Sequence, residues 1–127
     1  MKIVEMRGDK LRLKNMKTLF EKMLDGEIPA KFVYDDDICA AINDINPQAP
    51  VHVLLFPKKR IERMSVAKKE DAEILAHLLL TAPKIAAQCG LKDGFRVVLN
   101  NGLLAGETIP HLHLHILGGR QLHWPPC

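Results

Sequence analysis

The hydrophobic residues of this chain follow two periods, and each period predicts a different kind of element. Five short runs have the composition or the alternation of β-strands, in which successive side chains point to opposite faces. The third run is apolar except for His52, which indicates a central strand. The first two runs flank an acidic turn at residues 35–37 that suggests a hairpin. The predicted strands cover residues 31–34, 38–42, 51–56, 95–100 and 111–117.

Two other segments have the spacing of helices. A short helix is predicted over residues 16–24, with Thr18 as its N-cap and Glu21 completing a capping box. A long helix is predicted over about residues 69–89. Pro83 removes a helix hydrogen bond, so we expect a kink there or a helix in two pieces. The apolar stripe of the long helix consists of Ile74, Leu75, Leu78, Ala82, Ile85, Ala86 and Cys89.

The order of three strands, a long helix and two further strands predicts an α+β fold on a mainly antiparallel sheet of about five strands. A length of 127 residues with 47% hydrophobic residues fits one domain with its own core. No apolar run approaches the roughly 20 residues that cross a bilayer, and the N-terminal segment lacks the apolar stretch of a signal peptide. We therefore expect a cytoplasmic protein that does not bind membranes.

Cysteine and charge narrow the function classes further. Cys39, Cys89 and Cys127 are few, odd in number and far apart, which argues against a disulfide framework and a cysteine zinc site. The net charge of the chain is +3. Residues 1–17 hold six basic and two acidic residues, a net charge of +4, so the remaining residues carry a net charge of −1. A nearly neutral body does not suit a protein that binds duplex nucleic acid. Residues 1–16 are expected to be a flexible extension, and residues 17–127 the folded domain.

Three histidines, His111, His113 and His115, alternate with aliphatic residues near the C-terminus. On a strand all three imidazoles share one face, where they could bind a metal, transfer protons or attack an electrophile. Positions i and i+4 on a strand lie ~13 Å apart, too far to share one zinc ion. Two neighbouring histidines together with His52 remain a possible metal site, and three surface imidazoles without a role are the plainest alternative.

Phosphoryl chemistry is the third possibility. A neutral imidazole is a good nucleophile near pH 7, and flanking imidazoles can carry protons. Two loops of small residues, at 100–102 and 105–108, precede the histidines and offer backbone N–H groups to an anion.

The histidine row and several other segments resemble the histidine triad (HIT) superfamily. Residues 111–117, H-L-H-L-H-I-L, fit its signature of three histidines alternating with apolar residues. The resemblance covers about residues 17–127 and is strongest to the branch of histidine triad nucleotide-binding proteins, the purine nucleoside phosphoramidases. Further matching stretches are G-E-I-P-A (26–30), D-I-N-P-Q-A-P-V-H (44–52), P-K-K (57–59), F-R-V-V-L-N (95–100) and L-G-G-R-Q-L-H-W-P-P (117–126).

The resemblance implies a role for each histidine. His113 is expected to attack the α-phosphorus and form a nucleotidyl-histidine intermediate, which water then hydrolyses to AMP or GMP without a cofactor. His115 is expected to bind the phosphate with help from His52. His111 is expected to fix the tautomer of His113 through its main-chain carbonyl, leaving Nε2 free.

The resemblance also implies a nucleotide site and a homodimer. Asp44 matches the acid that holds the ribose hydroxyls. The helix at 69–89 and the strand at 95–100 are expected at the two-fold axis, with Trp124 shaping the leaving-group pocket of the partner subunit. The purine slot is matched by Leu19, Phe20, Ile42, Ile45 and Leu54, and the phosphate contacts by Asn100, Gly106, Glu107 and Thr108.

Glu107 departs from the family, which usually has glutamine there. A carboxylate ~4 Å from a phosphate charge costs about 4 kcal/mol at an effective dielectric of 20. Glu107 is therefore expected to turn away, to be protonated, or to weaken the activity. Alternatives to the phosphoramidase are a nucleotide-binding module that acts through protein partners and a dinucleoside polyphosphate hydrolase of the same superfamily.

Overall fold

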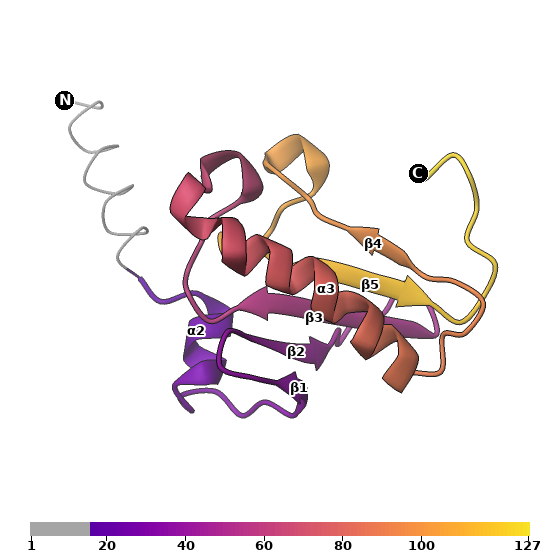
Figure 1. Ribbon diagram of the computed structural model, residues 1–127, viewed down its shortest axis with the longest axis horizontal. Helices are drawn as coiled ribbons and strands as arrows, with labels where there is room; N and C mark the ends of the chain where they lie inside the picture. Colours follow the sequence, from indigo (N-terminus) through magenta and orange to yellow (C-terminus); the bar gives the residue numbers. More distant parts are fainter. Residues whose placement is uncertain (1–15) are drawn as a thin grey trace.

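The computed structural model describes residues 16–127, so the expected flexibility of residues 1–15 concerns a segment outside this range. A five-stranded sheet forms the centre of the molecule, with the order β1-β2-β3-β5-β4, and every neighbouring pair is antiparallel (Figure 1). The predicted α+β fold and the central position of the third strand are confirmed. The strands are β1 (Phe32–Asp35), β2 (Cys39–Asn43), β3 (Val51–Pro57), β4 (Arg96–Val98) and β5 (Leu114–Gly118).

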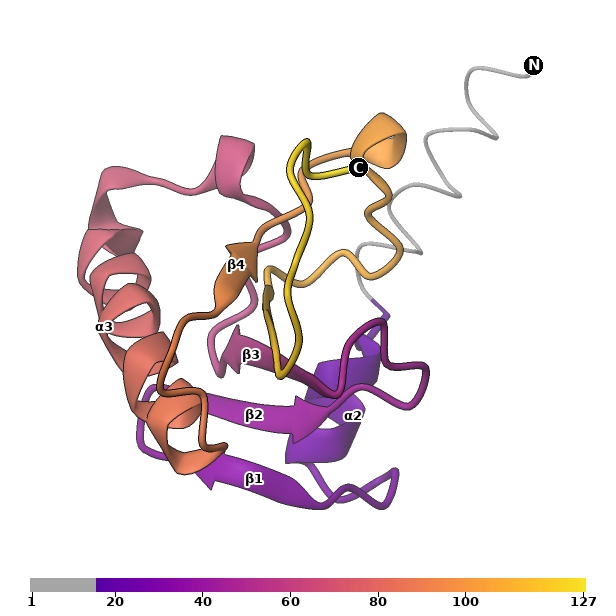
Figure 2. The same ribbon diagram turned by 90° about the vertical axis from the view of Figure 1, so that its right-hand side faces the viewer.

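Two helices of unequal length lie against opposite faces of the sheet. The long helix α3 (Ala72–Gln88) covers one face, and the short helix α2 (Leu19–Leu24) packs on the other (Figure 2). The α3 face holds the larger core, including Val53 and Leu55 of β3. The α2 face holds a smaller cluster around Phe20 and Phe56. Neither helix of the described residues is long and apolar enough to cross a membrane.

Helix α2 begins as its sequence predicts. The Thr18 hydroxyl accepts the backbone N–H of Glu21, and the Glu21 carboxylate accepts the backbone N–H of Thr18 at 2.9 Å. This reciprocal capping box satisfies two donors that a helix N-terminus leaves unpaired. It also places Phe20, the one fully buried residue of the helix, against the sheet.

The acidic turn forms the predicted hairpin between β1 and β2. One oxygen of Asp36 accepts the backbone N–H groups of Ile38 and Cys39, both at 2.8 Å. A side chain that bonds its own backbone two and three residues on stabilises a tight turn. The turn thereby orients Asp36 and begins β2 at Cys39.

Helix α3 is one continuous helix of 17 residues, so the alternative of two pieces at Pro83 is wrong. Pro83 lies on the exposed side of the helix, where the carbonyl four residues earlier, that of Leu79, can bond to water. The buried side consists of Leu78, Thr81, Ala82, Ile85 and Ala86. Thr81 was not part of the predicted apolar stripe, and Ile74, Leu75 and Cys89 of that stripe are only partly buried against the same core.

The last strand begins later than predicted. Its ladder starts at Leu114, opposite Leu55 of β3, whereas the alternating pattern predicted a start at His111. The residues before Leu114 lie where β3 ends, and the backbone N–H of Leu112 donates instead to the carbonyl of Ile61 at 2.7 Å. Strand β4 is likewise limited to residues 96–98 of the predicted 95–100.

Candidate active site

The histidine row lies on the α2 face of the sheet. Leu114 and Ile116 of β5 enter the core under α3, so the histidines that alternate with them point to the other side. The rings of His113 and His115 have centroids 5.1 Å apart, and the Phe20 ring lies 5.2 Å from that of His113. The late start of β5 therefore leaves the predicted grouping of the imidazoles intact.

His111 is fully buried and serves as a fixed support. Its Nε2 lies 2.7 Å from the carbonyl oxygen of Pro57, which can only accept, so Nε2 carries the proton. Its Nδ1 then accepts the hydroxyl of Thr18 at 2.8 Å. Burial lowers the pKa of His111, which keeps the ring neutral and preserves this tautomer.

His113 presents a free lone pair on Nε2. Its Nδ1 lies 2.7 Å from the carbonyl oxygen of His111, and this contact requires a proton on Nδ1. In the neutral ring Nε2 is then unprotonated. His113 is largely buried, so its ring is held in place by its surroundings as well as by this bond.

His115 is placed in the opposite tautomer. The backbone N–H of Gln48 donates to His52 Nδ1 at 3.0 Å, so the proton of His52 lies on Nε2. That nitrogen is 2.9 Å from His115 Nδ1, which accepts, and His115 carries its proton on Nε2. Burial, with smaller contributions from His113 and His52, lowers the pKa of His115 to about 4, so the ring is neutral near pH 7.

Asp44 joins this arrangement from the end of β2. One carboxylate oxygen accepts the backbone N–H of Asn46 at 2.8 Å, and the other lies 3.4 Å from His52 Nε2. One ligand atom from each of Asp44, His52 and His115 lies within 4.8 Å of the others, so these three residues could also hold a metal ion. Among the described residues, no such group includes His111 or His113, which the sequence left open as ligands.

The five residues of the predicted purine slot occupy different environments. Phe20 is fully buried and stacks on Phe56 with ring centroids 4.2 Å apart, which is core packing. Ile42 and Leu54 are buried beside it on the same face. Leu19 is exposed at 41% and Ile45 is fully exposed, so a single chain does not bring these two into an enclosed slot.

Glu107 is paired with Arg63, which the sequence analysis did not single out. Arg63 donates from Nε and Nη2, both at 2.9 Å, and the backbone N–H of Gly102 donates to the same carboxylate at 3.0 Å. These donors, Arg63 first, lower the pKa of Glu107, so the expectation of a protonated carboxyl is wrong. The carboxylate is held by its own loop and by Arg63.

The remaining predicted residues lie in loops. A 3-10 turn (Leu103–Ala105) separates Asn100 from Gly106, whose φ of 92° is a backbone conformation that favours glycine. Thr108 is exposed, and Trp124 is 80% exposed in the single chain. A hollow of about 520 Å³ between the loops at 90–96 and 119–122 contains none of the predicted site residues.

The resemblance implied the His111 carbonyl behind His113, but sequence reasoning missed the groups that fix the tautomers of His111 and His52. Thr18 was identified only as a helix cap, and neither the backbone N–H of Gln48 nor the carbonyl of Pro57 was considered. Backbone groups carry no sequence signal, and Thr18 is 93 residues away from His111. The capping motif predicted that the Thr18 hydroxyl accepts a helix N–H group, and the structure shows that it also donates to His111 Nδ1.

Comparisons with known proteins identify the family of this chain. The HIT domain family model matches residues 25–122. An uncharacterized HIT-like protein of Synechocystis is 57% identical over 109 residues, covering 86% of this chain and 96% of the relative. A 14 kDa zinc-binding protein of Zea mays is 46% identical over 117 residues, covering 91% of each. The crystal structure of a HIT family hydrolase from Legionella pneumophila has 45% identity and a TM-score of 0.84, covering 87% of this chain and 100% of that one.

Proposed function

Because the chain belongs to the HIT domain family, we propose that it is a hydrolase that cleaves the P–N bond of purine nucleoside 5′-phosphoramidates. The observation that carries the proposal is the 2.7 Å contact between His113 Nδ1 and the carbonyl of His111. In the neutral ring it leaves Nε2 of His113 with a free lone pair, which an attack on phosphorus requires. The relatives from Legionella pneumophila and Clostridium thermocellum are named HIT family hydrolases, which supports hydrolysis in general.

The reaction proceeds in two displacements. The lone pair of His113 Nε2 forms an N–P bond at the α-phosphorus, while the electron pair of the scissile P–N bond moves to the leaving nitrogen, which takes up a proton and departs as the amine. Water then attacks phosphorus and loses a proton, and Nε2 departs with its electron pair. The net change is a phosphoramidate and water giving a nucleoside monophosphate and an amine.

The neighbouring groups suit this reaction. His115, with its proton on Nε2, donates a hydrogen bond to a phosphate oxygen as negative charge moves in the transition state. Asp44, already held by Asn46, accepts from the ribose hydroxyls. Ile42 and Leu54 provide apolar surface for the base.

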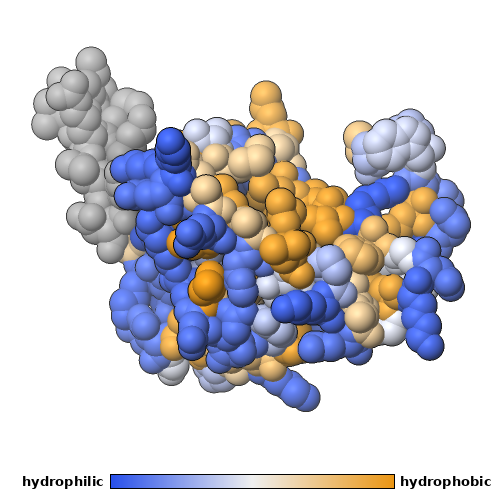
Figure 3. Space-filling model, in the orientation of Figure 1, coloured by the Kyte–Doolittle hydropathy of each residue, from blue (hydrophilic) through white to orange (hydrophobic). Residues whose placement is uncertain are grey.

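We also propose that the active form is a homodimer paired through α3 and β4. Leu79 and Leu80 of α3 are 61% and 70% exposed, and Val97 lies on β4, an edge strand of the sheet. Figure 3 shows hydrophobic side chains gathered on this side of the molecule. A second copy would cover this surface and complete the edge, and its Trp124 would reach the leaving-group side of the site.

The homodimer is tested by sedimentation. Leu80→Lys is expected to give a monomer at micromolar concentration, because a buried lysine opposes pairing. Leu104→Lys, at a fully exposed position outside this surface, is the control and is expected to leave the dimer intact. A wild-type protein that sediments as a monomer would contradict the pairing.

The hydrolase is tested with three substrates. Wild-type protein is expected to hydrolyse a fluorogenic adenosine phosphoramidate faster than a diadenosine polyphosphate or a nucleoside diphosphate, with EDTA present throughout. His113→Ala is expected to lose at least about 1,000-fold in kcat/KM, and quenched wild-type protein is expected to gain the mass of a nucleotidyl group on His113. Faster cleavage of the diadenosine compound would favour the dinucleoside polyphosphate hydrolase. Full turnover by His113→Ala would reject the mechanism.

The same variant, His113→Ala, distinguishes the hydrolase from a nucleotide-binding module that acts through protein partners. It predicts nucleotide binding without turnover on any of the three substrates. It also predicts that His113→Ala, expressed in cells that lack the protein, restores their growth as well as the wild type does.

Zinc binding is a second candidate function. The Zea mays relative is named a zinc-binding protein, and Asp44, His52 and His115 bring ligand atoms within 4.8 Å of one another. In this structure His52 and His115 bond to each other directly, which a metal between them would replace. Elemental analysis of tag-free protein, before and after His115→Ala, distinguishes this function from metal-independent hydrolysis.

A further inference from the structure

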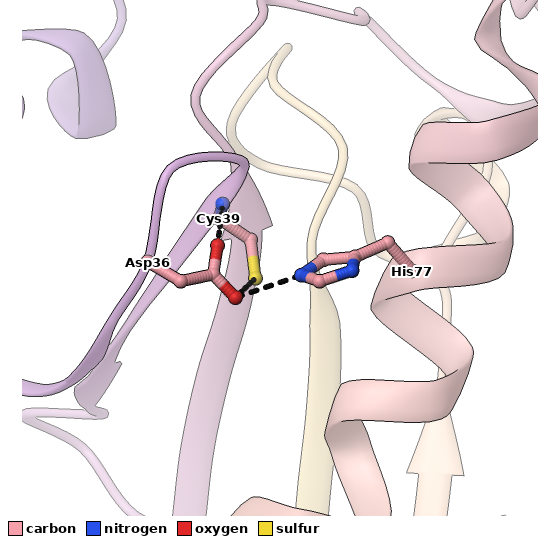
Figure 4. A group of neighbouring side chains, drawn as sticks. All are labelled: Asp36, Cys39 and His77. Carbon is pink, nitrogen blue, oxygen red and sulfur yellow. Dashed lines mark hydrogen bonds and ion pairs between the residues drawn. The ribbon is translucent and has the colours of Figure 1, made fainter.

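A second cluster of ligand-type side chains lies on the α3 face of the sheet, opposite the histidine row and beside the β1–β2 turn. Asp36 belongs to the β1–β2 turn, Cys39 begins β2, and His77 projects from α3 (Figure 4). His77 Nε2 lies 2.7 Å from Asp36 Oδ2, and the Cys39 Sγ lies 3.6 Å from the same oxygen. The proposed hydrolysis uses none of these three residues.

The Asp36 carboxylate is oriented by hydrogen bonds from residues outside the proposed ligand set and from its own turn. Asp36 Oδ1 accepts two backbone N–H groups of its own turn, so Oδ2 is left to face the other side chains. The Tyr34 hydroxyl donates to Oδ2 at 2.8 Å. Such outer contacts fix ligand geometry in metal sites, where a ligating carboxylate is itself hydrogen-bonded.

We propose that Asp36, Cys39 and His77 bind a divalent metal ion of the zinc class. Their oxygen, sulfur and nitrogen atoms all lie within 4.8 Å of one another, so a central ion can reach each of them at the usual ~2.0–2.3 Å after small side-chain shifts. A thiolate, an imidazole and a carboxylate form a donor set that suits Zn²⁺ and does not suit Mg²⁺ or Ca²⁺, which prefer oxygen alone.

Access and coordination number also fit. The Cys39 side chain is fully buried, whereas the side chains of Asp36 and His77 are 25% and 31% exposed. An ion can therefore enter from the solvent side and meet the sulfur last. Three protein ligands leave one tetrahedral position for water.

Binding is balanced by proton release. The Cys39 thiol loses its proton to solvent and the sulfur binds as thiolate, Asp36 binds as carboxylate, and a neutral His77 binds through Nε2 after its proton moves to Nδ1. Burial raises the pKa of the Cys39 thiol to about 12, and the ion has to offset this cost. The ion replaces the direct His77–Asp36 hydrogen bond and joins the β1–β2 turn to α3.

Without a metal the same side chains still link the turn to the helix through the His77–Asp36 bond. That link does not depend on the sulfur, whereas a zinc site does. The contribution of Cys39 therefore separates the two descriptions. Cys89, half-buried near the end of α3, supplies a matched cysteine outside the cluster.

The test measures metal binding without any substrate, so its outcome is independent of hydrolysis. Tag-free full-length protein is stripped with chelator and titrated with Zn²⁺, and with Co²⁺ to reveal thiolate ligation by its charge-transfer absorption. Wild-type protein is expected to bind a stoichiometric amount of zinc and to show the cobalt–thiolate band. His77→Ala and Cys39→Ser are expected to weaken Zn²⁺ binding by well over roughly tenfold, and Tyr34→Phe by about tenfold.

The controls locate the ion. Cys89→Ser and His115→Ala are expected to keep both the zinc affinity and the cobalt band, and bound zinc is expected to raise the Tm of wild type more than that of His77→Ala. If Cys39→Ser does not fold, His77→Ala at the half-exposed helix position gives the same answer. The proposal is overturned if wild type binds no zinc, if His77→Ala binds it as tightly, or if only His115→Ala loses it.

Discussion

The two faces of the sheet are built from the same strands but differ in what they contain. Along β3 and β5 the side chains alternate, so Leu55 and Leu114 go to the α3 face while His52 and His115 go to the other. Helix α3 has 17 residues and covers an aliphatic core, whereas α2 has six and covers only the cluster around Phe20. The histidine row lies on the face with the shorter helix, and His115 is the partly exposed member of the row. The α3 face contributes the larger hydrophobic core, and its ligand-type side chains, Asp36, Cys39 and His77, lie beside the β1–β2 turn.

The largest expected contrast between the faces is a separation of stability from activity. Leu78→Ala removes a buried side chain of α3 and is expected to cost about 2–5 kcal/mol in the free energy of unfolding. Turnover per folded molecule is expected to stay unchanged, because Leu78 contacts the opposite face from the histidines. Urea unfolding and an active-site titration measure the two quantities.

His113→Ala is expected to have the opposite effect to Leu78→Ala: the activity is lost and the free energy of unfolding changes little. Leu104→Ala, at a fully exposed position, is the control for Leu→Ala and is expected to change stability by less than about 0.5 kcal/mol. A loss of turnover per folded Leu78→Ala molecule would show that the faces are coupled.

Thr18 tests whether stability and activity are separate within the α2 face itself. Its hydroxyl caps α2 and also donates to His111 Nδ1. Thr18→Val is expected to cost about 1–2 kcal/mol of stability and to lower kcat as well, because His111 loses the partner that fixes its tautomer. Thr18→Ser keeps the hydroxyl and is expected to retain both. A Thr18→Val protein with full kcat would remove Thr18 from the positioning of His111.

Glu107 tests the charge at the edge of the same face. In the proposed nucleotide complex, Arg63 is expected to offset most of the repulsion between Glu107 and the phosphate, which leaves an effect of about 1 kcal/mol. Glu107→Gln is expected to raise kcat/KM on an adenosine phosphoramidate about fivefold, and Arg63→Gln to lower it by a similar factor. A decrease with Glu107→Gln would make the carboxylate a positive contributor.

The last expected effect is a dependence of stability on pH. The pKa of His115 is lowered from 6.5 to about 4, and burial lowers that of His111 in the same direction. Between pH 6.5 and 4 the unfolded chain binds protons that the folded chain does not, so stability falls as the pH falls through this range. Thermal unfolding of wild type and His115→Asn checks this, and the variant is expected to show a flatter profile. Equal slopes would assign the effect to other groups.

Periodicity predicted the elements and the two faces well, because it depends on neighbouring residues. It predicted the capping box at Thr18 and the apolar stripe of α3 for the same reason. It could not predict where a ladder ends, and so it began β5 three residues early. Hydrogen bonding between strands, which depends on the end of β3, decides that position.

The periodicity of the sequence could not predict pairings between residues that are far apart in the chain. Arg63 and Glu107 are 44 residues apart, and Asp36 and His77 are 41 apart, with no spacing rule that connects them. The resemblance supplied the histidine roles, whereas the structure supplied the partners that make those roles chemically reasonable. Ile45 shows the reverse case, since the resemblance placed it in a slot that a single chain leaves open.

The tautomers of His113 and His115 give two neighbouring rings opposite polarity. One offers an electron pair and the other a proton, although the side chains are chemically identical and lie two residues apart. Only the acceptors and donors behind them differ, a main-chain carbonyl in one case and a backbone amide acting through His52 in the other. In the proposed reaction the direction of electron flow thus depends on backbone atoms, which act on His113 directly and on His115 through the side chain of His52.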